Sequence, residues 1–120
     1  MSDTFTPVLY TKTDCPFCFK ARLFLLESGV ANQVELRNYV PGGAEEQEVR
    51  AKVAPHVEKF SVPVLETAPG EFLPDSDAII DHLTRKHGAT RDLPLLAAYR
   101  QHILGKLLEV YKELQQLKAK

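Results

Sequence analysis

The stretch Cys15-Pro16-Phe17-Cys18 contains both cysteines of this 120-residue chain, and it stands where an apolar run ends and a helical pattern begins. Residues 8–11 before it are apolar and partly β-branched, which predicts a strand. Residues 16–28 carry apolar side chains near one face and stop before Gly29, which predicts a helix. A C-x-x-C pair at a strand-to-helix turn of a small α/β chain indicates thiol–disulfide chemistry.

The two cysteines have different expected surroundings. Cys15 lies at the helix N-terminus, where unpaired N–H groups and the helix dipole favour a thiolate. A thiolate is the species that attacks a disulfide. Cys18 lies one helical turn further on, near enough to close a small ring with Cys15, and Pro16 fits the first turn, where its missing N–H costs nothing. We therefore predict both cysteines to be catalytic, with Cys15 as the attacking thiol.

The composition narrows the class of protein. With 44% apolar residues, a chain of this length can bury the core of one domain. A net charge of -1 does not favour nucleic acid or an anionic membrane as the main partner.

Residues 1–6 lack the features of a signal peptide, and no apolar run approaches the ~20 residues of a membrane span. Two close cysteines do not make a secreted disulfide scaffold, so we expect a reducing, cytoplasmic setting. The four histidines show no paired spacing that would complete a zinc site with the cysteines, and no metal is expected.

The remaining pattern predicts strands and helices in the order βαβαββα. Further strands are expected at residues 33–39, 62–65 and 71–73, and a charged helix at residues 44–53. Asp75-Ser76-Asp77 supplies N-cap residues for a last helix that ends at Gly88. Pro63 inside the third strand suggests an edge, a bulge or a bend.

A polar linker then leads to one long helix with a broad apolar stripe. The residues that recur along this stripe at three- to four-residue spacing are Leu96, Ile103, Leu107, Val110, Leu114 and Leu117. Such a stripe requires burial. We therefore expect a core of residues 1–88 and a segment of residues 89–120 whose helix packs on that core. Self-association of the helix is the alternative, and a monomer is expected rather than a dimer.

Three separated segments together resemble the dithiol glutaredoxins. Residues 10–18, Tyr-Thr-Lys-Thr-Asp-Cys-Pro-Phe-Cys, resemble their active-site segment, with a lysine three residues before the first cysteine. Ser61-Val62-Pro63 resembles the family's Thr-Val-Pro, in which the proline is cis, and Asp75-Ser76-Asp77 resembles the cluster that opens the last core helix. Residues 62–65 and 73–80 look closer still to the N-terminal domain of glutathione transferases. The resemblance covers residues 7–87 and implies a thioredoxin-like α/β fold with a four-stranded mixed sheet.

This resemblance also implies a function. A glutaredoxin is a glutathione-disulfide oxidoreductase, which reduces protein disulfides and glutathione mixed disulfides and so serves electron transport and cell redox homeostasis. Its co-substrate would be glutathione, and its partners would be glutathionylated or disulfide-containing proteins. Two alternatives stay open: a glutathione-transferase-like enzyme, and a non-catalytic module that binds glutathione or acts as an adaptor.

The residues expected to contact glutathione come from the same three segments. They are Lys12, Phe17, Val62, Pro63, Ser76 and Asp77. Lys12 would attract the glycine carboxylate and help to keep Cys15 ionised. Val62, held by a cis Pro63, would pair its backbone with the cysteinyl backbone of glutathione. Ser76 and Asp77 open a helix, and a helix N-terminus is an anion site, so they would take the γ-glutamyl end.

Overall fold

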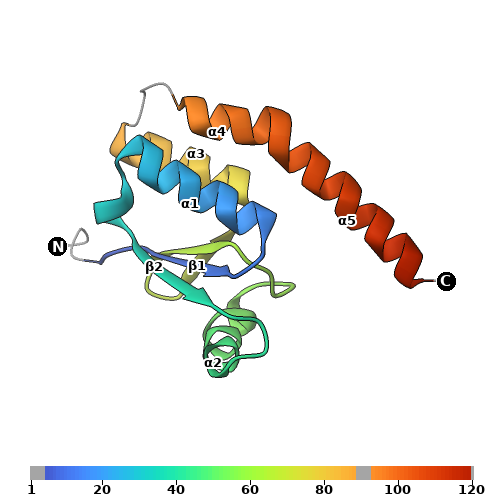
Figure 1. The fold of residues 1–120 in the computed structure, drawn as a ribbon. Helices are drawn as coiled ribbons and strands as arrows, with labels where there is room; N and C mark the ends of the chain where they lie inside the picture. Colours follow the sequence, from blue (N-terminus) through green and yellow to red (C-terminus); the bar gives the residue numbers. More distant parts are fainter. Residues whose placement is uncertain (1–4, 89–92, 120) are drawn as a thin grey trace.

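The computed structural model describes residues 5–88 and 93–119, and it contains one four-stranded sheet with helices on both faces (Figure 1). The strands are β1 (Val8–Lys12), β2 (Glu35–Tyr39), β3 (Val64–Ala68) and β4 (Glu71–Pro74). The helices of the core are α1 (Pro16–Ser28), α2 (Ala44–Val53) and α3 (Ser76–His87). The expected order βαβαββα is thereby confirmed, with short 3-10 turns at Ala31–Gln33 and Ala54–His56 between elements.

The sheet is mixed, as expected, with strand order β2-β1-β3-β4. Strand β1 runs parallel to β2 and antiparallel to β3, and β3 runs antiparallel to β4. Successive side chains of a strand point to opposite faces. Leu9 accordingly joins the core cluster of α1 and α3, whereas Val8 and Tyr10 join the cluster that contains the α2 residues Val49 and Val53.

Two strands begin later than expected, each for a local reason, and β1, β3 and β4 run one to three residues further than expected, to Lys12, Ala68 and Pro74. The third strand begins at Val64 instead of residue 62, because Pro63 has no N–H to donate to the ladder. The second strand begins at Glu35 instead of residue 33, because Ala31–Gln33 forms a 3-10 turn. Helices α1 and α2 have the predicted bounds, since Pro16 and Gly29 mark the ends of α1 and Gly43 precedes α2.

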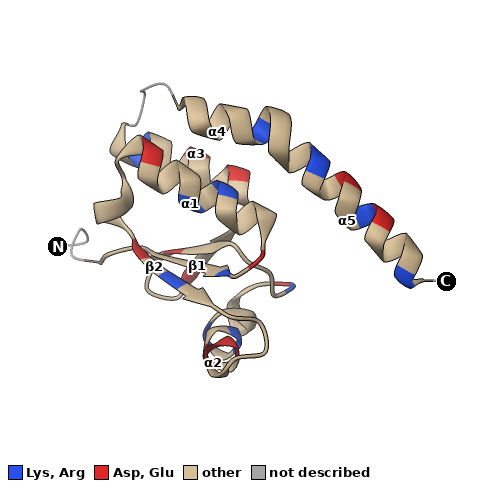
Figure 2. Ribbon diagram, viewed as in Figure 1, with Lys and Arg blue, Asp and Glu red and all other residues tan. Residues whose placement is uncertain are grey.

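The C-terminal segment forms α4 (Pro94–Ala98), a π-helical turn η4 (Tyr99–Leu104) and α5 (Gly105–Lys118), which follow one another as one long rod (Figure 1). Its first part packs on the core: Leu96 joins the cluster of α1 and α3, and Tyr99 and Leu104 are buried. The buried part of the rod ends there. No residue of α5 is buried, and this helix extends away from the sheet with charges of both signs along it (Figure 2).

None of the described helices is long and apolar enough to cross a membrane.

Candidate active site

Cys15 occupies the N-cap of α1, immediately after the loop that leaves β1. Its Sγ accepts a hydrogen bond from the backbone N–H of Cys18 at 3.2 Å, so the sulfur takes the place of the usual oxygen cap. Asp14 before it has a φ of 65°, in the left-handed region that aspartate tolerates better than most residues. Cys15 is half-buried, whereas the Cys18 side chain is 1% exposed, and both thiols are free.

This placement separates the acidities of the two thiols. A hydrogen bond from the Cys18 thiol has the largest influence on the pKa of Cys15 and lowers it. Partial burial raises this pKa, but the N–H groups of Cys18 and Phe17 and the charge of Lys12 lower it further. The result is a pKa of about 6 for Cys15, down from 9.0. The same thiol–thiol hydrogen bond, followed by burial, raises the pKa of Cys18 far above the ordinary value. At neutral pH the outer sulfur is therefore an anion and the inner one a proton donor.

The loop before β3 brings Val62 next to this sulfur. The Val62–Pro63 peptide bond is cis, and the Val62 carbonyl oxygen lies 3.9 Å from Cys15 Sγ. Lys12, at the end of β1, shares a surface recess with Val62 and Ser61. Three of the residues expected from sequence, Lys12, Val62 and Cys15, thus lie around one point of the surface.

The residues expected for the γ-glutamyl end have partners of their own. Asp77 forms ion pairs with Lys20 at 2.8 Å and with Arg100 at 3.3 Å. Ser76 is buried at 4% exposure, and Asp75 caps α3 by accepting the Ala78 N–H. The Phe17 side chain is 39% exposed, with the Lys20 ammonium 5.8 Å from the centre of its ring. The Lys20 ammonium therefore joins Asp77 to the Phe17 side of α1.

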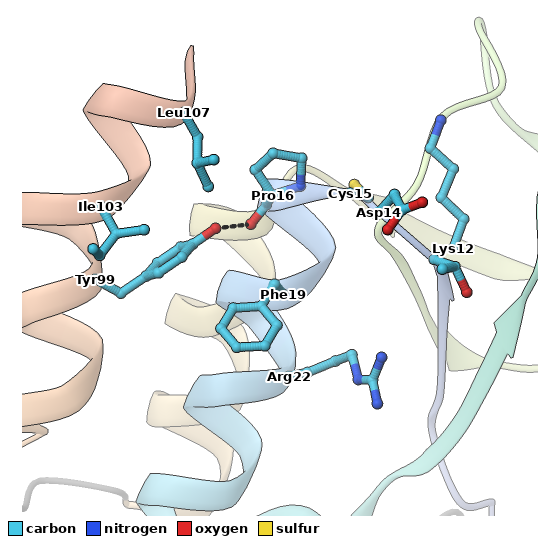
Figure 3. A pocket seen from close by; sticks show the side chains of 10 residues that line it. Lys12, Asp14, Cys15, Pro16, Phe19, Arg22, Tyr99, Ile103 and Leu107 are labelled. Carbon is cyan, nitrogen blue, oxygen red and sulfur yellow. Dashed lines mark hydrogen bonds between the residues drawn. The ribbon is translucent and has the colours of Figure 1, made fainter. Parts of the chain in front are cut away.

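An open pocket of about 550 Å³ adjoins Cys15 on its other side. The first two turns of α1 form one side of it, including Pro16 and Phe19, and the C-terminal rod forms the facing side (Figure 3). The Tyr99 hydroxyl donates to the Pro16 carbonyl at 2.7 Å, and its ring packs 5.3 Å from that of Phe19. Ile103 and Leu107 continue this apolar wall (Figure 3).

Sequence reasoning missed this wall, although a signal for it was present. Phe19 stands four residues after Cys15, which places both on one side of α1. Tyr99, Ile103 and Leu107 belong to the apolar stripe of the C-terminal helix, but their position beside Cys15 depends on how that helix docks. Lys20 was also missed, because a buried lysine between Phe17 and Asp77 requires the packing of α1 against α3.

The described residues contain no group of three or more histidine, cysteine, aspartate or glutamate side chains arranged to hold a metal ion.

The strand order, the N-cap cysteine and the cis proline facing it define a thioredoxin-like domain. Residues 9–91 match the glutathione S-transferase N-terminal domain family, and the chain belongs to that family. No curated protein sequence matches the chain.

Several solved structures share the fold. A possible glutathione S-transferase from Rhodopseudomonas palustris is 26% identical with a TM-score of 0.50, over 68% of this chain and 38% of that one. Glutathione transferase Omega 3C from Trametes versicolor is 19% identical with a TM-score of 0.55, over 79% of this chain and 42% of that one. A glutathione S-transferase from the Antarctic clam Laternula elliptica is 17% identical with a TM-score of 0.52, over 97% of this chain and 52% of that one. The match thus spans between 38% and 52% of the length of these proteins.

Proposed function

We propose that this protein is a glutathione-dependent thiol–disulfide oxidoreductase of the dithiol glutaredoxin kind. The observation that carries the proposal is the pair of sulfurs at the start of α1. Cys15 is half-buried, and its pKa of about 6 makes it a thiolate at neutral pH. Cys18 lies behind it, is buried and keeps its proton. A low-pKa, accessible thiol next to a second thiol is the arrangement that thiol–disulfide exchange requires.

In the glutathione route, the Cys15 thiolate attacks the glutathione sulfur of a mixed disulfide. A bond forms between the two sulfurs, and the old S–S bond breaks with its electron pair on the substrate sulfur, which takes a proton from water. The thiolate of a second glutathione then attacks the glutathione sulfur on Cys15. Oxidised glutathione leaves, the Cys15 thiolate returns, and Cys18 takes no part.

In the protein-disulfide route, Cys15 forms a mixed disulfide with one sulfur of the substrate and releases the other. Cys18 then loses its proton and attacks Cys15 Sγ, which closes a Cys15–Cys18 disulfide and frees the reduced substrate. Two glutathione molecules supply the electrons that reopen this disulfide. The raised pKa of Cys18 is compatible with this order, because Cys18 attacks only after Cys15 has given up its negative charge.

Glutathione would lie along the Val62 side of Cys15. The backbone of Val62, held by Pro63, would pair with the cysteinyl unit, and Lys12 would take the glycine carboxylate. Phe17 would line the mouth of the site. Ser76 and Asp77 would meet the γ-glutamyl end, where Asp77 already pairs with the Lys20 and Arg100 cations. This reaction needs a glutathione pool and no metal, so we propose a cytoplasmic setting. We also propose that the protein is a monomer and that its partners are glutathionylated or disulfide-bonded proteins.

The second candidate function is conjugation of glutathione to an electrophile. Membership of the glutathione S-transferase N-terminal family and the apolar pocket beside Cys15 favour it. The two functions make different demands on Cys15, because conjugation uses the thiolate of glutathione and has no step in which an enzyme disulfide forms.

The test compares Cys15→Ser and Cys18→Ser with the wild type on two substrates. We expect Cys18→Ser to keep turnover of a small glutathione mixed disulfide, coupled to glutathione reductase, and to lose most reduction of a protein disulfide. Cys15→Ser should lose both activities. Loss of mixed-disulfide turnover in Cys18→Ser would contradict the single-thiol route. Conjugation of an aryl halide that survives in Cys15→Ser would favour the transferase, and glutathione binding without either activity would favour the adaptor module.

A further inference from the structure

The pocket beside Cys15 lies between two rows of side chains on different helices. Cys15, Phe19 and Arg22 follow one another along α1 at a spacing of four and then three residues, which places them on one side of that helix. Tyr99, Ile103 and Leu107 form the facing row. The facing row is entirely apolar apart from the Tyr99 hydroxyl, which is engaged by Pro16. The pocket therefore has the Cys15 sulfur at one end of its α1 side and Arg22 at the other. The apolar row faces Phe19, and the Arg22 side chain extends on the side of α1 away from the C-terminal rod (Figure 3).

Arg22 differs from the other arginines that the structure describes. The other four form ion pairs, which are Arg37–Glu35, Arg50–Glu46, Arg85–Asp81 and Arg100–Asp77. The Arg22 residue is half-buried, yet its guanidinium takes part in none of the ion pairs or side-chain hydrogen bonds found within residues 5–88 and 93–119. A partly buried guanidinium without a partner favours a carboxylate, since it offers up to five donors in a planar fork that matches two carboxylate oxygens.

The distance along the helix limits what such a ligand can be. Seven residues separate Cys15 from Arg22, and at 1.5 Å per residue they are about 10 Å apart along the axis. Lys12 and Asp14 also line the pocket, but they lie on the β1 side of Cys15 and not beside Arg22 (Figure 3). A group that starts at the Cys15 sulfur and ends at Arg22 therefore crosses an apolar surface before it meets a positive charge.

We propose that Arg22 selects substrates whose departing thiol is apolar or aromatic and ends in a carboxylate. The inference rests on the proposed function: glutathione occupies the Val62 side of Cys15, and the other half of the mixed disulfide occupies the pocket. When Cys15 attacks the glutathione sulfur, the S–S bond breaks and its electron pair leaves with the thiol in the pocket. The apolar part of that thiol packs on Phe19 and Tyr99, and its carboxylate binds Arg22.

The test uses two synthetic mixed disulfides of glutathione, one with phenylmethanethiol and one with its 4-carboxylate derivative, whose thiols differ little in acidity. For the wild type we expect kcat/KM to favour the carboxylate by about five- to tenfold, mainly through KM. Arg22→Met should bring this ratio close to one, and Arg22→Lys should retain part of it because the charge remains. Arg85→Met, which removes an exposed cation from α3, is the matched control and should keep the wild-type ratio.

The outcomes separate this inference from the function on which it rests. Turnover of both compounds with equal kcat/KM in the wild type, or a preference that Arg22→Met leaves unchanged, would overturn the role of Arg22 alone. A neutral 4-carboxamide compound that behaves like the carboxylate would overturn it as well. Failure to turn over either compound, together with any other glutathione mixed disulfide, would overturn the proposed function and this inference with it.

Discussion

Cys15 and Cys18 are the same residue type three positions apart, and the first turn of α1 gives their sulfurs different surroundings. Cys15 caps the helix and receives the N–H of Cys18, while Cys18 is buried beneath it. The sequence alone predicts the positions of the two cysteines on the helix, one at its N-terminus and one a turn inside, because these positions depend only on where the helix starts. It could not place Tyr99 against Pro16 or pair Asp77 with Lys20, since those contacts join residues far apart in the chain.

The acidity of Cys15 leads to a prediction about pH. Thiolate absorbance of the wild type should rise with a midpoint near pH 6, and the rate of mixed-disulfide turnover should rise with it and level off above about pH 7.5. Because the folded pKa lies below the unfolded value, ionisation also stabilises the fold; this contribution is complete above the unfolded pKa and is lost as the pH falls through about 6. Cys18→Ala should raise the midpoint, since the Cys18 thiol is the main donor. A wild-type midpoint at or above the free value of ~8.5 would contradict the assignment.

Lys12 should act mainly on binding. Lys12→Ala is expected to raise KM for glutathione-containing substrates more than it lowers kcat, because a half-exposed contact with a carboxylate contributes on the order of 1 kcal/mol. Added salt should weaken binding to the wild type and have less effect on the variant. Lys112→Ala, on α5, is the control for loss of one positive charge. If KM in Lys12→Ala equals that of the control, Lys12 is an ordinary surface lysine.

At the scale of elements, α1 holds the C-terminal rod by capping the N-terminus of α4 with one of its own side chains. Helix α4 has no side-chain cap of its own. The Glu27 carboxylate of α1 accepts the Leu95 and Leu96 N–H groups at 2.7 and 2.8 Å instead. Helix bounds that Pro and Gly mark, such as those of α1, could be predicted from the sequence, whereas this cap could not, because 68 residues separate Glu27 from Leu95.

Removing this cap should loosen the rod without disturbing the sheet. Glu27→Ala is expected to lower the free energy of unfolding by about 1 kcal/mol, the usual cost of a lost N-cap, measured as a shift in the urea midpoint at constant slope. Glu27→Gln, which keeps an oxygen acceptor and loses the charge, should cost less. The control is Glu58→Ala on an exposed turn. Equal stability of Glu27→Ala and Glu58→Ala would show that the two hydrogen bonds contribute nothing net.

At the scale of the molecule, lengths explain why the apolar stripe of the C-terminal helix is only partly buried. Helix α1 has 13 residues and is about 20 Å long, whereas residues 94–118 form a rod of about 37 Å. The rod therefore overhangs the core, and its buried residues end at Leu104. The periodicity of apolar residues predicts the helix and its stripe correctly. It cannot predict how much of the stripe is buried, because that depends on the length of the core surface against which the helix packs.

Two truncations test whether this overhang contributes to stability. A chain ending after Leu104 keeps the buried Leu96 and Tyr99, so its free energy of unfolding should change by less than about 1 kcal/mol. A chain ending after Gly88 loses both side chains from the core and should be less stable by about 3 kcal/mol or more. Urea unfolding measures both, and mixed-disulfide turnover shows whether the folded fraction keeps its thiol chemistry.

If the two truncations are equally unstable, α5 must stabilise the wild type through a contact outside this monomer. Sedimentation would then show a dimer, and Leu107→Glu should dissociate it without unfolding the core, because Leu107 stands on the exposed stripe between Ile103 and Val110.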